Sequence, residues 1–105
     1  MSDILTVSYS FKDDVHSIDT GSIALPHITI DNREIPKDQR GGTAKQLLAA
    51  ASLYCYGSML AAAMLARDVE FDDLHATAEL EMGRNEQGKS RVLKMTIRCS
   101  VRVNE

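Results

Sequence analysis

The sequence has no excess of positive charge. Its 12 Lys and Arg residues are outnumbered by 15 Asp and Glu residues, which gives a formal net charge of −3 at pH 7. Nucleic acids and anionic membranes are held largely by clustered Lys and Arg that neutralise phosphate charges. We therefore expect neither nucleic acid nor a membrane as a partner.

Cysteine is scarce as well. The two cysteines, Cys55 and Cys99, form no CxxC motif and no Cys/His spacing typical of zinc, so we predict no metal site and no cofactor. The opening residues, MSDILTVSYSF, lack the basic region, long apolar core and cleavage site of a secretory signal, which favours the cytoplasm. In that reducing compartment the two thiols are expected to be free rather than joined in a structural disulfide.

Charge is absent from one long run, Leu47 to Ala66, inside the stretch Gly41 to Arg67. Apolar positions cover every side of its helical wheel, so a helix here has to be buried on nearly all faces. The run is long enough to span a bilayer. It is rich in Ala and only weakly hydrophobic, however, and a membrane span would leave the amphipathic strands on either side with nothing to cover. A central core helix is therefore preferred over a membrane span.

Before this helix the pattern is that of strands. Leu5 to Phe11 alternates apolar and polar residues, which predicts a first strand, and Val15 to Thr20 predicts a weaker second one. Ser22 to Leu25 and His27 to Ile30 are predicted to be extended on either side of Pro26. The strands thus lie within residues 1–30 of a chain short enough to be a single domain.

A charged segment, residues 31–42, is predicted to be an exposed loop that leads to the helix. The helix is predicted over residues 43–67, with Thr43 as its N-cap and Gln46 as the capping-box partner three residues later.

A β-hairpin is predicted over residues 74–104, around the turn sequence GRNEQGKS. The two strands alternate, and the positions expected to face inward are Leu74, Ala76, Ala78, Leu80 and Met82 on the first and Leu93, Met95, Ile97, Cys99, Val101 and Val103 on the second. The outer faces are acidic on one strand and basic on the other, so opposite charges can pair at about 0.2–1 kcal/mol each. A solvated face with matched signs is preferred over a binding patch.

The stretch GGTAKQLLAAASLYCYGSML, preceded by strands and a loop and followed by a hairpin, resembles the osmotically induced protein C and organic hydroperoxide resistance (OsmC/Ohr) family. The resemblance implies a single α+β domain over residues 1–105, in which antiparallel sheet segments wrap around a long buried central helix within an intertwined homodimer or a higher homo-oligomer. It also implies a thiol peroxidase in which a cysteine at the position of Cys55 attacks a small hydroperoxide and is returned to the thiol by a dithiol reductant. That chemistry needs a thiolate, and hence a nearby cation.

The sequence departs from the family pattern at the helix start, where Ala44 and Lys45 stand in place of Pro and Glu. The Glu would orient an activating arginine, a role that Lys45 cannot take over because its charge is opposite. Arg33 and Arg40 are candidate activators only because they lie near the helix in sequence. Lys45 is a third candidate, but about 15 Å of helix separates it from Cys55.

A second departure lies at the carboxyl end, where the family continues into a helix with a resolving cysteine and this sequence ends at Glu105. We interpret the chain as a shortened member. Cys99 falls on a strand, where a packing residue is the preferred interpretation. For Cys55, a reactive thiol and a buried packing residue are both left open.

Two functions follow. The first is an OsmC/Ohr-like hydroperoxide reductase that uses Cys55. The second is a catalytically silent dimeric protein of the same fold that binds a small apolar ligand or a protein partner. His16, His27 and His75 are interpreted as surface or strand residues, and Tyr54 and Tyr56 as core residues.

Overall fold

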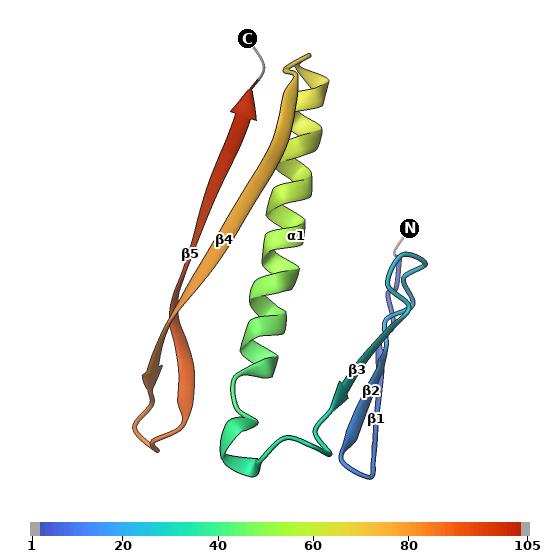
Figure 1. Ribbon diagram of the computed structural model, residues 1–105, viewed down its shortest axis with the longest axis vertical. Coiled ribbons are helices and arrows are strands. Elements are labelled where there is room, and N and C mark those ends of the chain that lie inside the picture. Colours follow the sequence, from blue (N-terminus) through green and yellow to red (C-terminus); the bar gives the residue numbers. More distant parts are fainter. Residues whose placement is uncertain (1–2, 104–105) are drawn as a thin grey trace. The chain divides into compact units, whose positions relative to one another are not determined.

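The structure is a computed structural model that describes residues 3–103 (Figure 1). The chain divides into two units, Met1–Gly41 and Gly42–Glu105, and each is described by itself. The fold is α+β, with antiparallel sheets and one long helix that packs against strands. The predicted ranges 1–30 and 74–104 extend to residues 1–2 and 104, which lie outside the described residues. That the whole chain forms a single domain stays a prediction.

The first unit is a three-stranded antiparallel sheet in the order β1-β2-β3, formed by β1 (Ser8–Lys12), β2 (Val15–Asp19) and β3 (His27–Asp31). Tyr9 pairs with Ile18 and Ile18 with Ile28, and the neighbouring row is Phe11, His16 and Ile30. Because residues paired across strands share a face, these six side chains lie on one side of the sheet. The sheet is therefore amphipathic, as the alternation predicted.

The first strand is shorter than predicted, since β1 begins at Ser8 rather than Leu5. The expected extension over Ser22 to Leu25 is wrong. This segment is a loop, closed where the Thr20 amide donates to the Pro26 carbonyl at 3.0 Å. Hydrogen bonds local to a loop compete with strand pairing in this way, and the alternation of side chains does not reveal them.

The second unit contains α1 (Thr43–Ala66) and the hairpin of β4 (Phe71–Arg84) and β5 (Ser90–Val103), with α1 lying along the hairpin (Figure 1). The predicted cap is wrong, because the N-cap is Gly42, with a φ of 89°, and no side chain caps the helix. Thr43 is instead the first helical residue, and the Gln46 amide donates to the Gly42 carbonyl at 3.0 Å. Glycine reaches this left-handed conformation without the steric cost that Thr would bear.

The predicted hairpin is confirmed. Leu74 pairs with Val101, Ala76 with Cys99 and Ala78 with Ile97, so the face predicted to be inward is continuous across both strands. On the other face Arg98 lies 2.7 Å from Glu79, one of the charge pairs expected there.

A bulge corrects the prediction for Leu93. The register shifts between Glu81, which pairs with Lys94, and Met82, which pairs with Val92, so Leu93 has no partner. Its side chain lies over Gly83, where an added Cβ would come 2.5 Å from Leu93 Cδ1. One extra residue reverses the alternation beyond it, and sequence periodicity cannot reveal where that residue falls.

Burial within the single chain is far lower than predicted for a central core helix. Ala49 is the only apolar residue of the described chain that is classed as buried. The inward positions Met82 and Val103 are 41% and 51% exposed, and Cys99 is exposed as well. The hairpin covers one side of α1 and leaves the opposite side open.

Candidate functional site

Cys55 lies near the middle of α1, in a run of Ala, Leu and Met that favours a helix because these side chains lose little rotamer freedom there. The helix ends in a Schellman motif. The Asp68 amide donates to the Leu65 carbonyl and the Val69 amide to the Met64 carbonyl, with Asp68 in the left-handed conformation at a φ of 57°. The last carbonyls of the helix are therefore satisfied, and the helix ends at Ala66.

Cys55 points away from the hairpin. Leu53 and Gly57 line an open groove with Leu74 and Ala76 of β4, so this side of α1 faces the strands. At about 100° per residue, Cys55 lies about 160° around the helix from Leu53. The thiol is exposed accordingly.

Within residues 3–103, the Cys55 thiol makes few polar contacts. Its one polar contact there joins its Sγ to the Met59 Sδ at 4.0 Å. Ser58, one turn away, donates its hydroxyl to the Tyr54 carbonyl at 2.7 Å, and Ser52 donates to the Leu48 carbonyl at 2.9 Å. Both hydroxyls are engaged with backbone and do not activate the sulfur.

Within one chain, Cys99 does not lie where its sulfur could meet that of Cys55. It pairs with Ala76, so it lies on the face of β5 that is turned toward α1, whereas Cys55 is on the far side of that helix. The possibility that the two sulfurs meet between sheet and helix is therefore wrong for the single chain. The exposure of Cys99 also argues against its interpretation as a buried packing residue.

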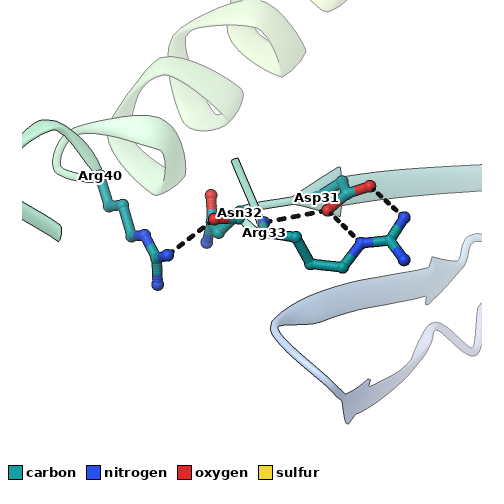
Figure 2. A network of polar contacts seen from close by, with 4 residues as sticks. All are labelled: Asp31, Asn32, Arg33 and Arg40. Atoms are coloured by element: carbon teal, nitrogen blue, oxygen red, sulfur yellow. Dashed lines mark hydrogen bonds and ion pairs between the residues drawn. The ribbon is translucent and has the colours of Figure 1, made fainter. Parts of the chain in front are cut away.

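The candidate activators Arg33 and Arg40 both belong to the first unit, where each is already engaged (Figure 2). Arg33 donates through Nε and Nη2 to the two carboxylate oxygens of Asp31, at 3.0 and 2.7 Å. This side-chain hydrogen bonding, with the Arg33 amide as a third donor, lowers the pKa of Asp31 from 3.8 to about 2, and the side-chain hydrogen bonds to Asp31 raise the pKa of Arg33.

Arg40 is held more firmly than Arg33. Its guanidinium donates to the carbonyls of Ile35 and Asn32, each at 2.7 Å, and lies 3.4 Å from Asp14 (Figure 2 shows the Asn32 contact). Its side chain is only 22% exposed, against 63% for Arg33. Arg40 therefore closes the loop between β3 and α1, which is a structural role.

Lys45 lies in the first turn of α1 and is half-buried. The structure thus brings Arg33 and Arg40 into one loop and puts Lys45 and Cys55 on one helix. It does not bring Lys45 within reach of the Cys55 thiol.

Two polar pairs of the first unit were missed when the histidines were interpreted one by one. The His16 Nδ1 lies 2.8 Å from the Tyr9 hydroxyl, and the His27 Nδ1 lies 2.5 Å from Asp19. Both pairs join neighbouring strands. The residues stand in the right alternation, but only the register brings them together, and the sequence does not state the register.

No His, Cys, Asp or Glu residues in the described part of the chain gather in a group of three or more that could hold a metal ion. By length and composition alone the segment Lys37–Ala66 is long and apolar enough to cross a membrane, a test that core helices of soluble proteins also pass. Comparisons with known proteins found no matching family model, no matching curated protein and no matching solved structure.

Proposed function

We propose that this protein is a cytoplasmic, thiol-dependent hydroperoxide reductase of the OsmC/Ohr type that works as a homodimer through Cys55. The observation that carries the proposal is the position of this thiol, which is exposed at the middle of α1 on the side that the hairpin leaves open. A nucleophile has to be accessible to a peroxide, and this side of the helix admits one.

The reaction follows from thiol chemistry. The Cys55 thiolate attacks the terminal oxygen of a hydroperoxide, the O–O bond breaks, and the products are a cysteine sulfenic acid and, once the alkoxide has taken a proton, an alcohol. A dithiol then restores the thiol and becomes a disulfide, and water is released. The first step needs a lowered thiol pKa and thus a cation close to the sulfur.

Of the two candidate arginines, Arg33 has the more exposed side chain and a single partner residue, Asp31. Its pair with Asp31 is exposed, and water screens the attraction within such a surface pair. Arg40 would have to give up two carbonyls and its ion pair with Asp14. We therefore rank Arg33 ahead of Arg40 as a proposed activator, and Lys45 stays a third candidate.

A second candidate function is a catalytically silent dimer that binds a small apolar ligand or a protein partner. It is favoured by the absence, in residues 3–103, of any hydrogen bond between the Cys55 thiol and a base or cation, and by the apolar groove that Leu53 and Gly57 line with β4.

An assay that measures the loss of an organic hydroperoxide by ferrous oxidation, with a dithiol reductant present, separates the two functions. The wild type and Cys99→Ser should consume peroxide, whereas Cys55→Ser should match the uncatalysed rate. Arg33→Gln should slow the consumption of peroxide, and Arg91→Gln, which removes the same charge from an exposed position of β5, is the control. If the wild type consumes peroxide no faster than Cys55→Ser, the hydroperoxide reductase is excluded and the catalytically silent dimer is the function that remains.

A further inference from the structure

Two sulfur atoms lie side by side on the exposed side of α1. The Sγ of Cys55 and the Sδ of Met59 are 4.0 Å apart. Both side chains are exposed, that of Met59 to 67%, so a dissolved ion can reach the two sulfurs. A thiolate and a thioether are soft donors, and soft donors select Cu(I). The pair therefore has the chemistry of a copper site.

The contact between the sulfurs follows from the order of the two residues along the helix. Residues four apart lie one above the other on the same face. A long side chain on a helix turns back toward the N-terminus, so the Met59 thioether reaches the Cys55 thiol one turn earlier. A methionine four residues before a cysteine would turn away from it. The sequence Cys-Tyr-Gly-Ser-Met thus builds a pair of donors on one element.

The distance between the sulfurs suits a single ion. A zinc–sulfur bond is about 2.3 Å long, so two metal–sulfur bonds of about this length span at most about 4.6 Å when they lie in line. The observed 4.0 Å is inside that limit and fits a bent arrangement as it stands. Rotation of the exposed Met59 side chain brings the two bonds into line without any movement of the backbone.

The neighbouring residues of α1 do not suit a harder ion. No charged residue occurs from Leu47 to Ala66. The hydroxyls of Ser52 and Ser58 donate to backbone carbonyls of the helix. Magnesium and calcium need several oxygen ligands, and a structural zinc ion needs four ligands. Two sulfurs are sufficient for a monovalent ion with a filled d shell, which points to Cu(I).

We propose that Cys55 and Met59 bind one Cu(I) ion in each chain. As the ion binds, the Cys55 thiol releases its proton and a thiolate–copper bond forms, while the thioether donates a lone pair and the oxidation state of copper does not change. The negative thiolate cancels the charge of the ion. The prediction of no metal site rested on the spacing of Cys and His, a pattern to which methionine does not belong.

Competition with bicinchoninate, a chelator whose Cu(I) complex is coloured, tests the site without any peroxide, so the outcome is independent of the proposed function. The titration is done without oxygen and with ascorbate as the reductant. The chains carry Cys99→Ser, which leaves Cys55 as their one thiol. Such a chain should remove one Cu(I) from the chelator, and addition of Cys55→Ser should abolish the removal. One Cu(I) for every two chains would overturn the proposal, because the ion would then bridge two thiols.

The role of the thioether is tested by Met59→Leu, which nearly preserves the volume of the side chain. It should weaken Cu(I) binding at least about tenfold, since even changes beyond the direct ligands lower metal affinity by about 10–100-fold. Met64→Leu is the matched control. Met64 lies on the same helix but about 180° around it from Cys55, so its replacement should leave the affinity unchanged. Equal affinities of the two variants would overturn the proposal.

X-ray absorption at the copper edge counts the sulfur atoms bound to the ion. The Cys99→Ser chain loaded with one Cu(I) should show two sulfur neighbours, and Met59→Leu in the same chain should show one. Circular dichroism checks that the helix of each variant is intact. A single sulfur neighbour in the chain that retains Met59 would contradict the proposal, because copper would then be held by Cys55 alone.

Discussion

At the scale of single residues, the pair of Asp31 and Arg33 shows how the loop before α1 is held. The guanidinium donates to both carboxylate oxygens and the Arg33 amide donates to one of them. Three donors favour the ionised carboxylate strongly even though both side chains are exposed. The ion pair therefore responds to acid in a narrow and definable range.

The Asp31 carboxyl should titrate with a midpoint of about 2, below its ordinary 3.8. Because the pKa is depressed in the folded state, the contribution of the pair to stability is complete above 3.8 and is lost as the pH falls through about 2. Carboxyl chemical shifts followed by NMR from above 3.8 to below about 2 measure the midpoint. Arg33→Gln should move it back toward 3.8, and Arg91→Gln in the other unit should leave it unchanged. A midpoint that is the same in Arg33→Gln as in the wild type would refute the assignment.

At the scale of elements, the carboxyl end of α1 holds an aspartate where helices usually place glycine. Asp68 has a φ of 57° and donates its amide to the Leu65 carbonyl. Side chains with a Cβ are strained in this left-handed region. The motif forms because its two hydrogen bonds satisfy carbonyls at the end of the helix.

Asp68→Gly should therefore raise the free energy of unfolding by about 0.5–1 kcal/mol, with relief of strain outweighing the greater freedom of the unfolded chain. Urea unfolding followed by circular dichroism measures the change. The same substitution at Asp73, in β4, serves as the control and should lower the free energy of unfolding by about 0.5–1 kcal/mol. Equal effects at the two positions would show that backbone conformation is not the cause.

The bulge in the hairpin provides a second test at this scale. A Cβ at Gly83 would lie 2.5 Å from Leu93 Cδ1 and 2.9 Å from its Cγ. Gly83→Ala should destabilise the protein by about 1–3 kcal/mol, the usual cost of overpacking. In a Leu93→Ala background most of this loss should disappear, because the clashing atoms are gone. A double-mutant cycle in urea measures the coupling, and additive effects of the two changes would show that Leu93 does not occupy this space.

These elements also show how far the sequence alone could go. The helix and the hairpin were predictable because the long uncharged run from Leu47 to Ala66 and two alternating segments give patterns that persist over many residues. The Leu93 bulge and the Gly42 cap were not, since each depends on the conformation of one residue. Cys55 could be singled out from its place in the helix. The direction in which the Cys55 side chain points could not be predicted, because it depends on which side of the helix the hairpin covers.

At the scale of the whole molecule, the hydrophobic surface is the dominant feature. Tyr54, Met59 and Leu65 of α1 are 77%, 67% and 64% exposed. Exposed apolar area costs about 25 cal/mol per Å² relative to burial, so a helix with this composition gains from any partner that excludes water from it. The same argument makes the proposed homodimer sensitive to a single charge placed on the side of α1 that the hairpin leaves open.

Leu48 and Leu93 provide a matched pair for that test, because they are 53% and 52% exposed and only Leu48 lies on the open side of α1. Leu48→Glu should weaken the dimer at least about 100-fold. A two-fold contact contains Leu48 twice, and burial of each leucine contributes about 1.5 kcal/mol or more. Leu93→Glu should leave the dimer intact, because Leu93 lies over Gly83 on the hairpin. Sedimentation equilibrium at micromolar concentration measures both dissociation constants. A wild type that sediments as a folded monomer, or equal weakening by the two substitutions, would mean that two copies of the chain do not meet on the open side of α1.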